Sequence, residues 1–196
     1  MRSRHVASCA AMRVIGGDLG GRVLRAPRGA STRPTSEKVR EAIFQILEHA
    51  GLELAGAHVL DLFAGSGAMG IEALSRGAAH ATFIDTGKPQ LAVVRENLRE
   101  LGLDRRATVL AGDAVSLAGR HAPPAPWRLV IVDPPYRSDL AVRAVSALPA
   151  AQLAPGAAIV IEHDRRNAPP DELRSLLRTD QRRYGDTLVS FYRVPT

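Results

Sequence analysis

The segment Asp133, Pro134, Pro135 and Tyr136 carries the most specific chemistry in the sequence and follows the apolar run Leu129–Val132 directly. Two consecutive prolines remove two backbone donors and stiffen the turn, so neighbouring carbonyl groups project from a rigid support. The Asp133 carboxylate and the Pro134 carbonyl can both accept hydrogen bonds from one exocyclic amine, and Tyr136 offers a face for stacking a base. The simpler alternative is a proline turn with an incidental aspartate. The segment therefore predicts a catalytic site that orients an amine.

A second motif, Asp61-Leu-Phe-Ala-Gly-Ser-Gly-Ala-Met-Gly70, lies between an apolar strand and a helix. Its glycines match G-x-G-x-x-G, and Asp85, about 20 residues further on, stands where a ribose hydroxyl is held in such folds. The motif indicates a nucleoside-bearing cofactor and leaves nicotinamide dinucleotide and S-adenosylmethionine both open. A purely structural tight turn is the alternative.

Asp61 favours one of these cofactors, because a carboxylate suits a ligand with a cationic amino-acid end and repels the pyrophosphate of a dinucleotide. Asp113 also ends a strand, and it either accepts from an adenine amino group or caps the following helix. Successive strands thus end in Asp61, Asp85, Asp113 and Asp133. Asp61 therefore shifts the balance toward S-adenosylmethionine as the cofactor.

Short apolar runs alternate with helical patterns along most of the chain. The predicted strands are Val59–Phe63, Ala81–Asp85, Thr108–Leu110, Leu129–Val132 and Ala157–Ile161, and the predicted helices lie near residues 67–76, 88–101, 138–148 and 170–178. Fully apolar strands separated by helices indicate a parallel sheet covered on both faces. Near the end, residues 182–184 and 188–194 flank Gly185-Asp186, which predicts an antiparallel hairpin. The expected fold is α/β, a doubly wound and mostly parallel sheet of seven strands.

The N-terminal region differs from the rest in charge. Residues 1–40 contain nine basic and two acidic residues, a net +7, whereas the whole chain is +6 and the other 156 residues are therefore −1. Two β-type runs, 13–15 and 22–25, flank a glycine-rich connection and predict a hairpin, and Thr35 or Ser36 can cap a following helix. We divide the chain into a basic extension, residues 1–50, and a catalytic domain, residues 51–196.

A localised basic charge indicates a polyanionic partner, because each neutralised phosphate releases counterions. The predicted RNA contacts are Arg13, Arg22, Arg25, Arg33, Lys38 and Arg40. The alternative is that 24 Arg against 2 Lys reflect a compositional habit and that the extension is merely solvated.

Other classes of protein are disfavoured by composition. No apolar run approaches the ~18 residues of a membrane helix, and the first residues lack the apolar core of a secretion signal. Cys9 is the single cysteine, and neither it nor the six histidines falls at metal-ligand spacing. We expect a cytoplasmic protein with no metal, no membrane and no obligate protein partner.

Several longer segments resemble a known family. The glycine motif and the tetrad at 133–136 resemble class I amino-methyltransferases, and Arg13-Val-Ile-Gly-Gly17, Arg33-Pro-Thr-Ser-Glu-Lys-Val-Arg-Glu-Ala-Ile-Phe44 and Tyr184-Gly-Asp-Thr187 resemble the bacterial family that methylates N2 of a guanine in 16S ribosomal RNA. The resemblance runs from Met12 to the end. It implies a Rossmann-like methyltransferase that takes 16S ribosomal RNA or the small ribosomal subunit as its substrate. It also implies S-adenosylmethionine as the cofactor, with contacts at Asp61, Phe63, Gly65, Gly67, Asp85 and Asp113, and a target pocket at Asp133, Pro134, Pro135 and Tyr136. The family commonly has glutamate where this sequence has Asp85, and residues 1–11 lie outside the pattern.

Four alternatives remain at this point. A DNA adenine-N6 methyltransferase would share the tetrad but needs an added recognition domain, and a release-factor glutamine methyltransferase would share only the core. A non-catalytic RNA-binding module and a nicotinamide-dependent oxidoreductase belong to other classes, which binding of S-adenosylmethionine without affinity for NAD would separate.

Overall fold

The computed structural model describes residues 12–27, 36–135 and 138–195 of the 196. Its helices are α1 (Glu37–His49), α2 (Ala68–Ser75), α3 (Lys88–Leu101), α4 (Ala114–Arg120) and α5 (Leu140–Ala147), with short 3-10 turns η1 (Gly17–Leu19), η2 (Asp104–Arg106), η3 (Ala150–Gln152) and η4 (Arg165–Asn167). Its strands are β1 (His58–Leu62), β2 (His80–Asp85), β3 (Ala107–Ala111), β4 (Trp127–Val132), β5 (Leu153–His163), β6 (Glu172–Leu173), β7 (Leu176–Tyr184) and β8 (Thr187–Arg193).

These strands form one sheet in the order β3-β2-β1-β4-β5-β8-β7-β6. The first five in that order are parallel, and β8, β7 and β6 are antiparallel to their neighbours. The chain builds outward from β1 to β3 and then returns to place β4 on the other side of β1. A switch in strand order of this kind opens a ligand site beyond the strand ends. The predicted doubly wound α/β fold with an antiparallel C-terminal pair is confirmed.

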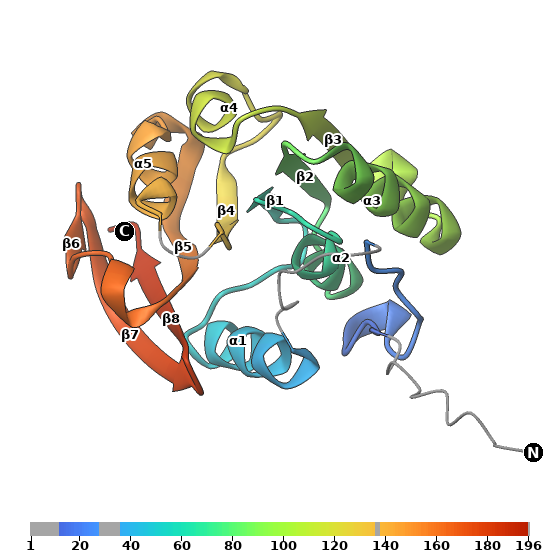
Figure 1. Ribbon diagram of the computed structural model, residues 1–196, viewed down its shortest axis with the longest axis horizontal. Coiled ribbons are helices and arrows are strands. Elements are labelled where there is room, and N and C mark those ends of the chain that lie inside the picture. The colour runs from blue at the N-terminus through green and yellow to red at the C-terminus, as the bar shows by residue number, and fades with distance from the viewer. Residues whose placement is uncertain (1–11, 28–35, 136–137, 196) are drawn as a thin grey trace, which may run out of the picture.

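Helices cover both faces of the sheet, as Figure 1 shows. One apolar core joins the sheet to α1, α2 and α3, and a second joins it to α4 and α5. Adjacent strand residues divide between the cores, Val59 belonging to the first and Leu60 to the second. Because both faces are buried, apolar residues in the parallel strands occur consecutively, as in Leu129–Val132 of β4, instead of alternating with polar ones.

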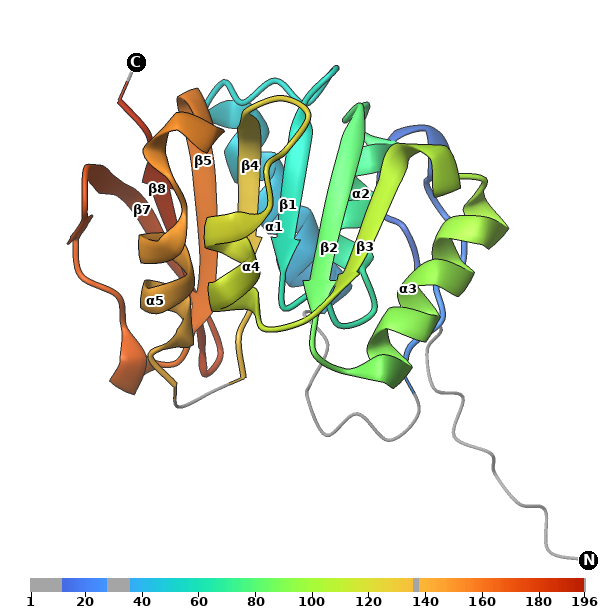
Figure 2. The ribbon, with the colours of Figure 1, turned by 90° about the horizontal axis from the view of Figure 1, so that it is seen from above.

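All five parallel strands point to the same side of the molecule, which Figure 2 shows most directly. We call this side the carboxyl edge; there β1, β2, β4 and β5 end at Leu62, Asp85, Val132 and His163. The opposite side is the amino edge. The carboxyl edge receives every loop that follows a parallel strand, so it collects the side chains singled out above.

The expected helix near residues 170–178 is wrong, and the sheet has eight strands instead of seven in the described chain. Residues 172–173 and 176–184 form β6 and β7, and Leu173 pairs with Leu176 across a two-residue turn in which Arg174 has a φ of 59°. Both leucines are buried in the core that contains α5. Apolar residues three apart fit a helix, but here a tight hairpin brings them to one face.

The N-terminal arm, residues 12–27, is an irregular hairpin. Its regular pairing is limited to one bridge, Arg13 with Val23, and η1 forms part of the connection between the two segments. Ser36 then caps α1 by accepting a hydrogen bond from Val39 N at 3.3 Å, which confirms one of the two expected caps. The arm and α1 pack in the same core as the sheet through Val14, Leu24 and Phe44.

Candidate active site

The glycine loop joins β1 to α2 and needs its small residues for two physical reasons. Gly65 and Gly67 have φ values of 56° and 77°, in the left-handed region that favours glycine. A Cβ on Gly70 would lie 2.4 Å from Cε1 of Phe83, so any side chain there would collide with β2. Phe63 opens the loop at a φ of 64°, unusual for a residue with a Cβ. Strained residues of this kind concentrate at ligand sites.

Asp61 lies beneath this loop instead of at its open mouth. The side chain is 2% exposed, and its Oδ2 accepts a hydrogen bond from Gly70 N at 2.9 Å, in the first turn of α2. Burial raises the pKa of Asp61 to about 8, with the nearby Asp85 raising it further and the Gly70 bond opposing both. A negative charge here has too little compensation, so the site favours an added positive group.

Asp85 and Asp113 both bond to backbone amides. The Oδ2 of Asp85 accepts from Gly65 N at 2.9 Å and its Oδ1 from Gly87 N at 2.8 Å, so this carboxylate fixes the glycine loop. Asp113 caps α4 by accepting from Ser116 N at 2.8 Å, and that bond lowers its pKa. The helix-cap alternative for Asp113 is therefore confirmed, and its contact with adenine stays a prediction.

The tetrad leaves the sheet beside the glycine loop. Val132 pairs with Leu62, and Asp133 N donates to the Leu62 carbonyl at 3.4 Å. Pro134 is buried and Pro135 exposed, while Ser138 Oγ donates to the Pro135 carbonyl at 2.8 Å and braces the turn. Tyr136 lies outside the described residues. The two motifs, 72 residues apart between Asp61 and Asp133, thus meet on neighbouring strands.

The predicted RNA contacts do not lie together. Arg13, Arg22, Arg25 and Lys38 are exposed, but Arg40 is 0% exposed, with its Nε 3.7 Å from Glu72 Oε2 and its Nη2 donating to the Arg13 carbonyl. The expectation that Arg40 contacts RNA is corrected, because its guanidinium is buried inside the protein. Arg33 falls outside the described residues.

The turn of the arm lies far from the tetrad. Leu19 N bonds to Ser75 Oγ at the end of α2, and Arg22 Nη2 donates to the Glu100 carbonyl near the end of α3 at 3.3 Å. Both helices begin at the carboxyl edge, so their ends lie at the amino edge. In contrast, Arg13 N bonds to Glu37 Oε1 at the start of α1, close to Lys38 and the carboxyl edge. The basic charge of the arm is therefore spread along the height of the molecule.

Two buried polar residues that the sequence analysis missed fasten the arm to α2 and α3. Glu72 is 0% exposed and accepts from Ile15 N and Gly16 N, both at 2.8 Å, and from Arg76 Nε at 2.9 Å. Asn97 is 1% exposed; its amide exchanges hydrogen bonds with the backbone of Arg25 and donates to the Ser66 carbonyl in the glycine loop at 3.1 Å. Glu72 could have been found from the sequence, since it is the one ionisable residue in the otherwise apolar helix α2.

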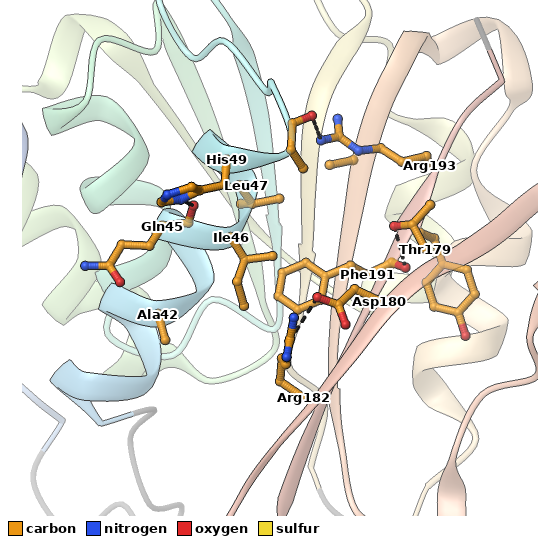
Figure 3. A pocket seen from close by; sticks show the side chains of 13 residues that line it. Ala42, Gln45, Ile46, Leu47, His49, Thr179, Asp180, Arg182, Phe191 and Arg193 are labelled. Carbon is orange, nitrogen blue, oxygen red and sulfur yellow. Dashed lines mark hydrogen bonds and ion pairs between the residues drawn. The ribbon is translucent and has the colours of Figure 1, made fainter.

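A separate groove lies away from both motifs. It has a volume of about 750 Å³ and lies between α1 and strands β5, β7 and β8. Figure 3 shows Ala42 and Arg182 at one end and His49 and Arg193 at the other. Neither the glycine loop nor the tetrad lines it, so its size does not make it the active site.

The described part of the chain offers neither a metal cluster nor a membrane helix. No group of three or more His, Cys, Asp or Glu among the described residues is arranged to hold a metal ion. The helices seen in residues 12–27, 36–135 and 138–195 are all too short or too polar to cross a membrane.

Comparison with known proteins identifies relatives along nearly the whole chain. A model of the family described as "Conserved hypothetical protein 95" matches residues 12–193. A Bacillus subtilis protein described as "Putative rRNA methyltransferase YlbH" is 39% identical over 93% of this chain and 98% of its own. The "Ribosomal RNA small subunit methyltransferase D" of Escherichia coli K12 is 35% identical over 87% of this chain and 83% of its own.

A solved structure described as "Putative methyltransferase yhhF from Escherichia coli" superposes with a TM-score of 0.79 at 32% identity, covering 95% of this chain and 99% of that one. The Rossmann-like class I methyltransferase fold expected from the sequence is therefore confirmed. The resemblance to methyltransferases of ribosomal RNA is confirmed as well.

Proposed function

We propose that this chain methylates the exocyclic N2 amine of a guanine in 16S ribosomal RNA, with S-adenosylmethionine as the methyl donor. The chain belongs to the family described as Conserved hypothetical protein 95. The observation that carries the proposal is the junction of β1 and β4. There the glycine loop and the tetrad leave neighbouring strands at the same level, with Leu62 paired to Val132. A cofactor on the loop and an amine on the tetrad would then be adjacent.

The residues of the loop fit S-adenosylmethionine. Asp61 is a buried carboxyl whose pKa is raised to about 8 because its charge lacks compensation, and the ammonium group of an amino acid would supply that compensation. Asp85 can accept from ribose hydroxyls through the second lone pair of each oxygen, since one lone pair of each is used by the loop. Carboxylates at the ends of four strands disfavour a pyrophosphate. When bound, S-adenosylmethionine supplies an electrophilic methyl group.

The tetrad orients and activates the amine. The lone pair of an arylamine is delocalised into its ring, so the nitrogen is a weak nucleophile. The Asp133 carboxylate and the Pro134 carbonyl accept its two hydrogens, which favours a pyramidal nitrogen and the positive charge that grows on it. The proton that leaves the nitrogen goes to Asp133 or to water. Tyr136 stacks on the base, and stacking of about 1–3 kcal/mol offsets much of the cost of flipping it.

The arm supplies part of the RNA-binding surface. Arg13, Arg22 and Lys38 neutralise phosphates, and Arg22 reaches a part of the RNA distant from the target base. Arg25 is instead neutralised within the protein by Glu100 at 2.6 Å and Glu96 at 3.4 Å. A substrate that extends from the amino edge to the carboxyl edge is a folded RNA or a ribosomal particle instead of a short strand. We place the activity in the cytoplasm, where small ribosomal subunits are assembled.

One experiment tests the site and another tests the substrate. Asp133→Ala is expected to lower the rate of methyl transfer by at least roughly 100-fold, the scale of losing one transition-state partner, while binding of S-adenosylmethionine by calorimetry is unchanged. Ser138→Ala, which removes only the brace on Pro135, is the matched control and should cost much less. Full turnover by Asp133→Ala would exclude the tetrad as the active site.

The substrate is tested by nucleoside mass spectrometry of 16S RNA from a deletion strain. One N2-methylguanosine should be lost, and plasmid-borne wild-type protein should restore it where Asp133→Ala does not. If every N2-methylguanosine remains, the assignment to ribosomal guanine fails. Loss of N6-methyladenine from DNA, or of methylglutamine from release factors, would instead identify one of the two alternative substrates.

A further inference from the structure

The carboxyl edge continues past the tetrad onto the antiparallel strands. Val132, which precedes Asp133, pairs with Ile161 on β5; the next residue, Glu162, pairs with Val189 on β8; and Val189 pairs with Arg182 on β7. Arg182 therefore lies level with Asp133, three strands away. Because neighbouring strands lie about 4.8 Å apart, the backbones of Arg182 and Asp133 are separated by roughly 14 Å.

This stretch of the edge carries exposed cations. Arg165 and Arg166 are the first two residues of η4, which follows β5 after Asp164, and neither has an ion pair with another described residue. Arg183 is also exposed, and its Nε donates to the Gly185 carbonyl in its own turn at 2.8 Å. Arg182 differs, because Asp180 Oδ2 lies 3.0 Å from its Nε and neutralises it. We refer to Arg165 and Arg166 of η4, together with Arg183 at the end of β7, as the hairpin cations.

The backbone that carries Arg165 and Arg166 is fixed. Asp164 Oδ1 accepts from Arg166 N at 2.7 Å and from Asn167 N at 3.0 Å. The Asp164 carbonyl can only accept, so His163, 4% exposed, donates to it from Nδ1 at 2.9 Å. The segment after β5 is therefore held by the end of its own strand.

The same histidine links that segment to the two last strands. With Nδ1 protonated, His163 Nε2 accepts from the Ser190 hydroxyl at 2.8 Å, and Gln181 Nε2 donates to the same hydroxyl at 2.9 Å. Burial lowers the pKa of His163, consistent with the neutral ring that this chain of bonds requires. Side chains presented on a rigid backbone lose less entropy when they bind a ligand.

The arm and the hairpin cations lie on opposite sides of the tetrad. Figure 2 shows the arm at the end of the molecule that carries α3, where it contacts α2 and α3, while β7 and β8 lie at the other end of the sheet. An enzyme that flips a base must hold the strand while that base leaves its stack. The arm alone serves this purpose poorly, because Arg22 lies at the amino edge.

We propose that Arg165, Arg166 and Arg183 form a second RNA-binding surface, which binds phosphates of nucleotides flanking the target base on the side of the tetrad away from the arm. The inference rests on the proposed function. RNA is the partner favoured by three unneutralised cations at the edge that carries Asp133, since phosphate contacts set the register of a nucleic acid on a protein. The tetrad would then lie between two points of attachment.

The test compares charge reversals at the two edges of the sheet. Arg165→Glu/Arg166→Glu is expected to weaken binding of an unmethylated 16S RNA transcript by roughly tenfold or more at 0.1 M salt, and to lower the slope of log K against log salt by about 1.4–1.8. Arg183→Glu should lower the slope by about half as much. Binding of S-adenosylmethionine and the circular dichroism spectrum should match the wild type. The control, Arg120→Glu, makes the same charge change as Arg183→Glu in an exposed arginine at the end of α4, on the face of the sheet away from the arm, and should leave affinity and slope nearly unchanged.

The outcomes separate this proposal from the proposed function. If Arg165→Glu/Arg166→Glu binds the transcript as the control does, the second surface is wrong, although methylation of guanine by the wild type would still support the proposed function. If wild-type protein neither binds nor methylates the transcript or small-subunit particles, the proposed function fails. Loss of activity on particles alone, with transcript binding intact, would identify a protein partner and overturn an RNA surface. Arg165→Lys/Arg166→Lys keeps the charge and should keep the salt slope.

Discussion

The arm and the β7–β8 hairpin lie on either side of the candidate active site but are attached to the molecule by different means. The hairpin is held by backbone pairing, with six residue pairs joining β8 to β5. The arm has a single β-bridge and depends on Glu72 and Asn97, two buried side chains that receive or supply its backbone hydrogen bonds. A ladder distributes hydrogen bonds over the backbone of many residues, whereas the arm relies on apolar packing and on a few side chains, among which Glu72 and Asn97 accept or donate the most hydrogen bonds. Single substitutions should therefore affect the arm much more than the hairpin.

The largest effect is expected from Glu72→Ala. The substitution leaves the guanidinium of Arg40 buried without its carboxylate and removes the acceptor for Ile15 N and Gly16 N. Breaking a buried ion pair in this way typically costs 3–5 kcal/mol. Chemical denaturation should show this loss, and hydrogen exchange should accelerate at Ile15 and Gly16. Glu48→Ala, which removes the exposed partner of Arg76, is the control and should cost about 1 kcal/mol or less. Equal losses in the two variants would contradict the importance of burial.

Asn97→Ala tests the second attachment. It removes three hydrogen bonds that join α3 to Arg25 and to Ser66, and a cost of about 1–3 kcal/mol in unfolding free energy is expected. Because Ser66 belongs to the glycine loop, the dissociation constant for S-adenosylmethionine should also rise. Ser190→Ala removes the hydrogen bonds that join Ser190 in β8 to His163 and Gln181, and it should leave cofactor binding unchanged. If both variants bound the cofactor normally, Asn97 would have no role in shaping the loop.

Asp61→Asn tests the loop to which the arm is attached, and the expected effect depends on pH. The pKa of Asp61 in the folded protein is about 8 and lies above its ordinary value of 3.8, so the folded state binds more protons between these values. Stability of the cofactor-free protein should therefore fall as pH rises from about 4 through 8. Asparagine keeps the acceptor for Gly70 N and lacks the charge, so the variant should be more stable than wild type at pH 8 by roughly 1–3 kcal/mol. Scanning calorimetry from pH 5 to 8.5 checks this, and a parallel decline in the variant would assign the pH dependence to other groups.

The smallest effect is expected on the hairpin surface. Arg182→Ala removes a solvent-exposed pair with Asp180, and such pairs contribute about 0.2–1 kcal/mol. Thermal unfolding should shift by no more than a few degrees. A large loss would mean that the hairpin, like the arm, depends on single side chains.

Patterns that depend on burial and on strand ends were predictable from the sequence. Apolar runs at 129–132 and at 59–62, the latter interrupted only by Asp61, predicted parallel strands. A sheet brings the ends of such strands together, so Asp61 and Asp133 could be assigned to one edge without coordinates. The physical reason is that parallel strands fix both burial and direction. The cap at Ser36 follows equally local chemistry.

Features decided by tertiary partners were not predictable. Arg40 counts as one more positive charge in the sequence, and only folding reveals that Glu72, 32 positions away, neutralises it in the interior. Leu173 and Leu176 satisfy a helical spacing, and the neighbouring β8 decides for a hairpin instead. The depth of Asp61 beneath its loop likewise depends on Phe83 and Gly70, which the sequence does not bring together.

The place of β8 in the sheet has a consequence for synthesis of the protein on the ribosome. β8 lies between β5 and β7, yet it is translated after both. Until residues 187–193 have emerged, β6 and β7 have no strand that joins them to the rest of the sheet, and the edge of β5 is open to any other extended chain. The parallel half can fold while translation continues, but the hairpin end cannot. Nascent chains stalled before residue 187 should therefore be recognised by chaperones and proteases much more readily than chains stalled after residue 193 has left the ribosome.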